Sequence, residues 1–288
     1  MSERMKENKE VTKKVDQAQE NYVDERVKKI TEEAVEAINL VTQVIELLDK
    51  KDKEKAIETI EKVLGKLEVL IARDPNLQVV PVDVKEQVID FPGTVEDVEA
   101  AKTEVVLLIK AGEVQLARDI MLQLASELDI FVTALPIGTY PVVLKAIIPL
   151  IEQGKFEEAK ALLIEALETL VIEKIVIPLP ILRAEQAIIR ANELANQENP
   201  NKEELKQLLA YAKEQLELAE ALGYGKKDID YKDLYEEIEK LEKILEGEES
   251  TEDIFATLKE KLSAIMAMFN KPKAPTEMPK AEKKEENK

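Results

Sequence analysis

Apolar side chains recur at helical spacing along most of the chain. Every third or fourth position is apolar between residues 27 and 48, and the same spacing returns over residues 53–71, 94–110, 114–128, 156–170, 181–196, 202–222, 231–245 and 251–269. The spacing changes over residues 77–82 and 84–91, which are rich in valine and isoleucine and are interrupted by Pro81. Two short strands or an extended hairpin-like excursion are predicted there, and the β-branched residues 129–135 and 172–177 predict two more strands.

One pattern occurs three times, over residues 47–75, 108–136 and 150–178. Each copy has an aliphatic pair (47–48, 108–109, 150–151), a turn residue (Lys51, Gly112, Gly154), an alanine (Ala56, Ala117, Ala159), a leucine (Leu67, Leu128, Leu170) and a closing proline (Pro75, Pro136, Pro178). The spacing within the pattern is the same in all three copies, which indicates a duplicated helix–turn–helix unit.

These patterns predict a mainly α protein of α+β type: repeated helix–turn–helix units, short strands after the repeats, and charged helices at the C-terminal end. The strands are expected to pair, because a lone strand leaves its backbone groups unsatisfied. The alternative is an all-helical solenoid of tetratricopeptide type. Along the chain we expect a disordered or frayed segment over residues 1–22, a helical domain over 23–225, a helical extension over 226–270 and a disordered tail over 271–288.

Charge narrows the range of partners. The net charge is −19, but residues 1–30 carry +1 and residues 271–288 carry +2, so the residues between them carry −22. Such a body repels phosphate backbones, which argues against nucleic acid as a partner and favours cationic ligands or basic protein segments. The simpler alternative is a solvated acidic surface that keeps the protein soluble. Abundant glutamate and lysine without cysteine, histidine or tryptophan are typical of thermophilic proteins.

Sequence also bears on the compartment. No run of apolar residues is long enough to span a membrane, and the first fourteen residues are polar and mixed in charge. As written, the chain is expected to be cytoplasmic, or periplasmic if a signal has been removed.

The residue types limit the available chemistry. The chain has no histidine and no cysteine, which excludes Ser-His and Cys-His nucleophile pairs, the usual zinc sites and haem or iron–sulfur ligation. No glycine-rich phosphate-binding motif occurs. We therefore expect a protein that is not an enzyme and has no catalytic residues, no cofactor and no metal. A carboxylate-pair hydrolase is the remaining enzymatic alternative.

Three residues are candidate ligand contacts. Arg183 and Arg190 lie seven positions apart on one predicted helix, where they are suited to an anionic ligand; the alternative is a pair of surface ion pairs. Tyr140, at a joint between strand and helix, is a candidate pocket residue, with packing as the alternative. The apolar stripe of residues 251–269 must be covered by the body or by a second copy, and a dimer or higher oligomer is expected.

The sequence resembles the YfdX family of bacterial proteins over residues 27–222. The resemblance rests on the Gly112/Ala117 and Gly154/Ala159 turns, residues 79–91, residues 132–136 and residues 176–180. It implies a mostly helical, self-associating, non-enzymatic protein of the stress response, with chaperone-like activity or binding of hydrophobic or cationic small molecules between helix pairs. Unfolded client proteins are the other implied partners. A helical-repeat scaffold that binds a partner peptide is the alternative function.

Overall fold

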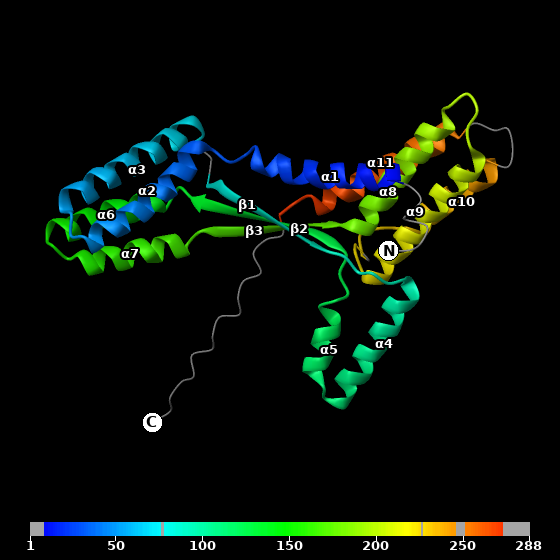
Figure 1. Ribbon diagram of the computed structural model, residues 1–288, viewed down its shortest axis with the longest axis horizontal. Coiled ribbons are helices and arrows are strands. Elements are labelled where there is room, and N and C mark those ends of the chain that lie inside the picture. The colour runs from blue at the N-terminus through cyan, green and yellow to red at the C-terminus, as the bar shows by residue number, and fades with distance from the viewer. Residues whose placement is uncertain (1–8, 76–77, 226, 246–250, 273–288) are drawn as a thin grey trace. The chain divides into compact units, whose positions relative to one another are not determined.

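The computed structural model describes residues 9–75, 78–225, 227–245 and 251–272, and it divides the chain into two compact units. Among the described residues, unit 1 consists of those within 9–22, 86–129 and 175–271, and unit 2 of those within 23–85 and 130–174. The described part contains eleven helices and three strands, so the prediction of a mainly α protein with a minor β element is confirmed (Figure 1). The N-terminal residues 1–8 and most of the predicted C-terminal tail lie outside the described residues.

Unit 2 is built from two helical hairpins that pack on each other. The first hairpin is α2 (Glu32–Asp49) with α3 (Lys53–Arg73), and the second is α6 (Tyr140–Glu152) with α7 (Phe156–Glu168). Helix α2 packs on α7, and α3 packs on α6. Their inward stripes form one continuous core, in which Leu48, Ile60, Ile151 and Leu163 are fully buried. Unit 2 is therefore a four-helix arrangement made from the first and third copies of the repeat.

The turns of the three repeats have the same geometry. Lys51, Gly112 and Gly154 all have positive φ angles, of 57°, 83° and 75°. In each copy the turn residue and the residue after it donate backbone hydrogen bonds to the carbonyls of the aliphatic pair, at 2.9–3.1 Å. Such bonds satisfy the last carbonyls of the first helix. The alanine that follows is buried in all three copies, which confirms that the helix–turn–helix unit is repeated.

The second repeat forms α4 (Val95–Ala111) and α5 (Val114–Met121) of unit 1. Helix α4 begins with a reciprocal capping box, in which Thr94 Oγ accepts from the backbone N–H of Asp97 and Asp97 accepts from the backbone N–H of Thr94. Helix α5 is shorter than the predicted span 114–128, because Leu128 already belongs to the next strand.

Three strands form one sheet in the order β1-β2-β3: β1 (Val79–Ile89), β2 (Glu127–Pro136) and β3 (Val171–Pro178). The predicted strands 129–135 and 172–177 therefore pair, which rules out the all-helical solenoid. The prediction of two strands over 77–91 is wrong, because residues 79–89 form a single strand that includes Pro81. An edge strand tolerates proline, which lacks a backbone donor, since one side of the strand has no partner.

Five further helices complete unit 1: α1 (Lys9–Val27, of which residues 9–22 belong to this unit), α8 (Leu179–Ala195), α9 (Lys202–Leu222), α10 (Tyr231–Leu245) and α11 (Glu252–Phe269). Helix α8 packs on α9 and α11, and α10 packs on α9 and α11. Phe255, Leu258 and Leu262 of α11 are buried. The apolar stripe of residues 251–269 is thus covered within the chain itself.

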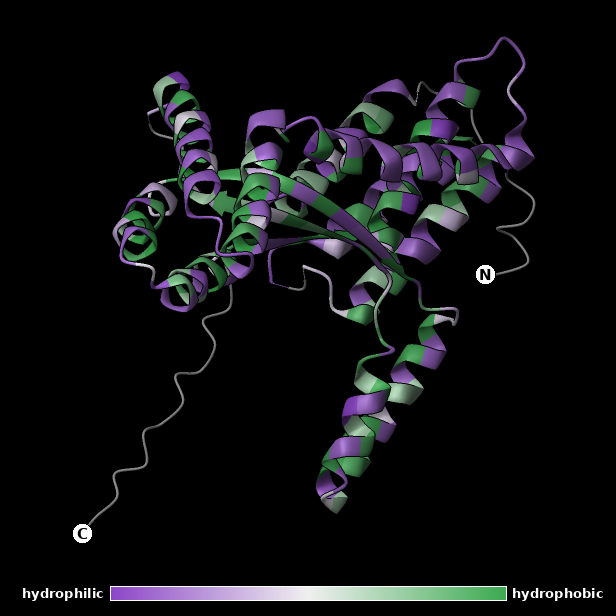
Figure 2. Ribbon diagram, turned by 60° about the vertical axis from the view of Figure 1, so that its left-hand side comes forward, coloured by the Kyte–Doolittle hydropathy of each residue, from purple (hydrophilic) through white to green (hydrophobic). Residues whose placement is uncertain are grey.

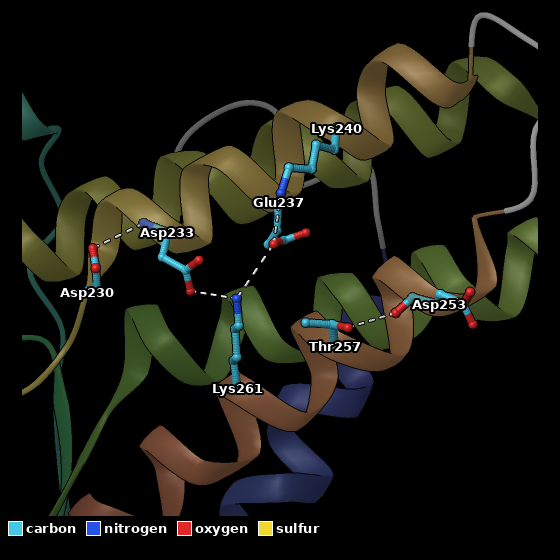
Figure 3. Close-up of polar contacts among 7 residues, drawn as sticks. All are labelled: Asp230, Asp233, Glu237, Lys240, Asp253, Thr257 and Lys261. Atoms are coloured by element: carbon cyan, nitrogen blue, oxygen red, sulfur yellow. Dashed lines mark hydrogen bonds and ion pairs between the residues drawn. The ribbon is translucent and has the colours of Figure 1, made fainter.

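Polar contacts also join α10 to α11 (Figure 3). Lys261 of α11 lies 2.5 Å from Asp233 and 3.6 Å from Glu237, which are one turn apart on α10. Hydrogen bonding to Asp233 and the two nearby carboxylates raise the pKa of the Lys261 amine. The lysine therefore keeps its charge and holds the two helices in register along the edge of the apolar contact.

Candidate functional site

A cleft of about 960 Å³ lies between α1, α8 and α9 in unit 1. Arg183 and Arg190 of α8, two of the three predicted ligand contacts, both line it. The other lining residues come from the start of α1 (Lys9, Glu10, Val11, Thr12, Val15, Asp16, Gln19) and from the first half of α9 with its cap (Asn201, Glu203, Glu204, Lys206, Gln207, Leu208, Ala210, Tyr211). The site combines apolar side chains with four basic and four acidic residues.

Helix α1 forms one wall of this cleft and is mostly polar. Val11 and Val15, one turn apart, are 4% and 6% exposed and anchor it. Ion pairs on either side fix its position, from Glu10 to Arg190 at 2.6 Å and from Lys14 to Glu193 at 2.7 Å. Two buried valines and exposed ion pairs stabilise a helix only modestly, so this wall is held more weakly than α8 or α9.

Arg183 is held at the cleft by an ion pair with Asp90, in which the arginine side chain is 10% exposed and the aspartate side chain 36% exposed. Its Nη1 and Nη2 donate to the two carboxylate oxygens of Asp90 at 3.1 and 2.7 Å, and Ser126 Oγ donates to the same carboxylate at 2.7 Å. Burial by itself raises the pKa of Asp90, but the hydrogen bonds and charge of Arg183 outweigh it and hold the pKa below its usual value. Asp90 therefore stays ionised and neutralises the arginine.

Arg190 is likewise neutralised by carboxylates. Its guanidinium lies 2.6 Å from Glu10, 3.7 Å from Glu204 and 3.8 Å from Glu193. The structure thus brings both arginines to one cleft and places both in ion pairs, as the alternative interpretation of these residues predicted. Because their charges are compensated inside the protein, the cleft has no strong excess of positive charge with which to attract an anion.

The apolar part of the cleft comes from α9 and α1. Tyr211 is 9% exposed, and burial raises its pKa to about 12, so its hydroxyl is uncharged at neutral pH. Leu208 lies next to it on α9, and Val11 and Val15 line the cleft from α1. One aromatic ring with aliphatic neighbours and a few placed polar groups is the usual composition of a site for a small organic molecule.

Tyr140 lies elsewhere, in the core of unit 2 at the start of α6. It is 1% exposed, and burial raises its pKa to about 12. Its hydroxyl has no hydrogen-bond partner within the described residues. The side chain packs against the unit 2 core and does not belong to the cleft.

A second and more acidic groove, of about 920 Å³, lies between α4, α9 and α10 of unit 1. Its charged lining consists of six glutamates and two lysines (Glu96, Glu99, Glu214, Glu217, Glu220, Glu242, Lys102, Lys213). Tyr235 in this groove donates its hydroxyl to Glu220 at 2.8 Å, and Lys213 pairs with Glu239 at 2.9 Å. The net charge of this groove is more negative than that of the cleft, but its apolar lining is limited to Val95, Ala210, Ala221 and the ring of Tyr235.

The described residues lack both a metal-binding group of carboxylates and a membrane-spanning helix. Within them, no three or more aspartates and glutamates are grouped to hold a metal ion. None of their helices combines the length and the hydrophobicity needed to cross a bilayer. The role of α1 was not predicted from the sequence. The available signal was short: the valine pair Val11 and Val15, one helical turn apart, beside the carboxylate of Glu10.

Comparison with known proteins gives two findings. Residues 37–176 match the family model described as YfdX protein. The chain is similar to a solved structure of Salmonella Typhi YfdX. The comparison covers 52% of this chain and 93% of the Salmonella chain, with 15% sequence identity and a TM-score of 0.37. No curated protein matches the chain. The residues of the cleft lie outside the matched stretch, on either side of it.

Proposed function

We propose that this protein, whose residues 37–176 belong to the YfdX family, is a non-enzymatic stress-response protein that binds amphipathic small molecules between its helices. The carrying observation is the cleft between α1, α8 and α9, where Tyr211 and aliphatic side chains lie beside charged groups of both signs. The stress-response role comes from the family resemblance. The place of binding comes from the geometry of the cleft.

The chemistry of the lining suggests the ligand class. An apolar or aromatic ring fits against Tyr211 and Leu208, where it leaves water together with the apolar wall. A positively charged amine fits beside Asp16 and Glu203, because neither of these carboxylates forms one of the arginine ion pairs. The charge of −22 on residues 31–270 raises the local concentration of cations around the whole protein. A cationic amphipathic molecule meets all three conditions.

The non-enzymatic part of the proposal rests on residue types. The sequence has no histidine or cysteine, the side chains most often used as general base and nucleophile at neutral pH. The two arginines of the cleft are engaged by carboxylates of the protein itself. We infer that the cleft holds a molecule without transforming it.

The test is a calorimetric titration of the full chain with 9-aminoacridine, a flat cationic ring, and with 1-anilinonaphthalene-8-sulfonate, a flat anionic one. Saturable one-site binding of the cation, with weaker binding of the anion, supports the proposal. The double variant Asp16→Asn/Glu203→Gln should weaken binding of the cation about tenfold, since each lost ion pair is worth about 0.5–1 kcal/mol.

A matched control comes from the same part of the chain. Glu20 of α1 and Glu198 before α9 are exposed and do not line the cleft. The double variant Glu20→Gln/Glu198→Gln makes the same change in net charge and should bind the cation as the wild type does. Equal weakening by both double variants would show that only the overall charge attracts the dye, and the cleft would be abandoned as the site.

Chaperone-like activity and scaffold binding are separated by a parallel assay. Suppression of aggregation of a denatured client, with no saturable binding of either dye, would move the function to protection of unfolded chains. Saturable binding of one specific peptide, with neither dye binding nor client protection, would move it to the helical-repeat scaffold.

A further inference from the structure

The α4–α5 hairpin exposes an unusual number of large apolar side chains. About half or more of the side chain is accessible to solvent at seven positions in this hairpin and directly after it (Val106, Leu107, Ile109, Val114, Leu116, Met121, Leu122). Figure 2 shows hydrophobic colour along both helices of this hairpin, which extends from the rest of unit 1. Residues 105–109 are five consecutive apolar positions, which cover more than one full helical turn. A helix that is apolar all round is normally buried on all sides.

The first and third copies of the repeat show how exposed these positions are when a second hairpin packs against them. Ile109 aligns with Leu48 and Ile151, which are 1% and 0% exposed, whereas Ile109 is 52% exposed. The contrast recurs on the second helix of the hairpin. Met121 aligns with Ile60 and Leu163, both 0% exposed, whereas Met121 is 56% exposed. In the first and third copies these positions form the core between two hairpins; in the second copy the same positions face solvent.

The difference lies in the packing of the hairpins. In unit 2 the first and third copies cover each other, α2 against α7 and α3 against α6. Within the described residues, α5 packs mainly on α4, and α4 packs on α9 through Val98, which contacts Leu218 and Ala221 near the start of the hairpin. The second copy has the turn, the buried alanine and the apolar surface of the other two, but no second hairpin pairs with it in the part of the chain that the structure describes.

We propose that the α4–α5 hairpin pairs with the same hairpin of a second copy of this chain, in the way that α2–α3 pairs with α6–α7. In that arrangement α4 lies against α5 of the partner and α5 against α4 of the partner. Each contact then occurs twice, which is the requirement for a two-fold dimer. Ile109 and Met121 become the centre of a four-helix core.

Area and charge both favour a second copy as the occupant. The seven exposed apolar side chains are spread over both helices of the hairpin and the residue after it, and a stable interface buries ~800 Å² per partner. Residues 104–122 carry three acidic and two basic side chains (Glu104, Glu113, Asp119, Lys110, Arg118), so this stretch has a charge of −1 on a body of −22. Two such acidic bodies repel each other least where this nearly neutral segment meets its own copy.

The first test is the mass of the full chain in solution by size-exclusion chromatography with light scattering, over a range of concentrations. The wild type should be a dimer, and Ile109→Glu and Met121→Glu should each shift it to monomer. Helical content by circular dichroism should be unchanged, because both side chains are already exposed in the single chain. Val142→Glu is the control: Val142 of α6 is 66% exposed, has no place in the hairpin and should leave the dimer intact.

The second test uses the absence of cysteine from the sequence. Mixed Ile109→Cys and Met121→Cys chains should form intermolecular disulfides under mild oxidation, whereas Val142→Cys chains should not. A monomeric wild type at all concentrations would overturn the proposal. So would a dimer that is unaffected by both glutamate variants, because another surface would then join the copies. Neither result bears on dye binding in the α1–α8–α9 cleft, so the two proposals fail independently.

Discussion

Lys51 offers a sharp test of the repeated turn. It is the one residue other than glycine with a positive φ angle in the described part of the chain, at 57°, and it occupies the position that Gly112 and Gly154 hold in the other two copies. Its side chain is exposed and forms none of the hydrogen bonds or ion pairs found within the described residues. Replacing it with glycine should therefore remove backbone strain without removing a contact.

The size of the effect follows from two opposing terms. The left-handed conformation costs a residue with a Cβ atom roughly 1–2 kcal/mol relative to the right-handed one. Glycine lacks this penalty but loses more conformational freedom on folding, which costs about 0.5–1 kcal/mol. Lys51→Gly should therefore stabilise the protein by about 0.5–1 kcal/mol, which for a chain of this size raises the melting temperature by about 1–4 °C.

The neighbouring residue provides a matched control. Lys50 is the C-cap of α2 and has an ordinary right-handed conformation, with φ of −81°. Lys50→Gly removes the same side-chain type but relieves no strain, so it should destabilise by about 0.5–1 kcal/mol. Gly154→Ala reverses the experiment: a Cβ atom at residue 154 meets no heavy atom within 4 Å, so its expected loss of about 1 kcal/mol is purely backbone strain.

Thermal unfolding by circular dichroism gives the melting temperatures, and hydrogen exchange of peptides from α2 and α3 shows whether the change is local. The reasoning fails if Lys51→Gly is no more stable than the wild type, or if it is destabilised as much as Lys50→Gly. Either result would mean that the left-handed geometry of Lys51 carries no strain in solution.

Three further substitutions test unit 1. Asp90→Asn should destabilise it by about 1–3 kcal/mol at neutral pH, because the buried Arg183 loses its counter-charge while the partial exposure of Asp90 limits the loss. Since the pKa of Asp90 is lowered by folding, the difference from wild type should persist above about pH 3.9 and disappear as the pH falls through the folded pKa. Glu185→Gln should instead stabilise unit 1, because burial raises the pKa of the Glu185 carboxyl. Above the folded pKa the variant should be more stable than wild type by on the order of 1 kcal/mol, and below about pH 4.3 the two should be equally stable. Tyr231→Phe should cost about 1 kcal/mol, because the Tyr231 hydroxyl donates a 2.7 Å hydrogen bond to the carbonyl of Tyr224. Denaturant titrations across pH measure all three, and unchanged stability of Asp90→Asn at neutral pH would contradict the account of the ion pair.

Local signals in the sequence predicted much of the fold. Gly112 ends α4 by a mechanism that acts over a few residues, and the repeated pattern predicted this turn correctly. The span of β1 was harder to predict, because Pro81 interrupts the strand pattern and only tertiary structure reveals that the strand lies at a sheet edge. The packing partners of the hairpins were not predictable, because no local sequence pattern indicates that the first copy of the repeat packs on the third.

The candidate site was predicted only in part. Arg183 and Arg190 share a helix, so their common location follows from helical spacing. Their carboxylate partners Asp90 and Glu10 are far away in sequence, and no periodicity identifies them. Tyr140 lies at a joint that suits either a pocket or a core, and the choice depends on the helices packed around it.

The most direct test of the cleft is hydrogen–deuterium exchange of the full chain with and without saturating 9-aminoacridine. Binding between α1, α8 and α9 should slow exchange in residues 9–19 and 183–190, with the largest change in α1 because that wall is held most weakly. Peptides from residues 94–102 and 235–242, which line the acidic groove, should be unchanged. Protection confined to those groove peptides, or no protection in residues 9–19 and 183–190, would contradict the assignment of the cleft as the binding site.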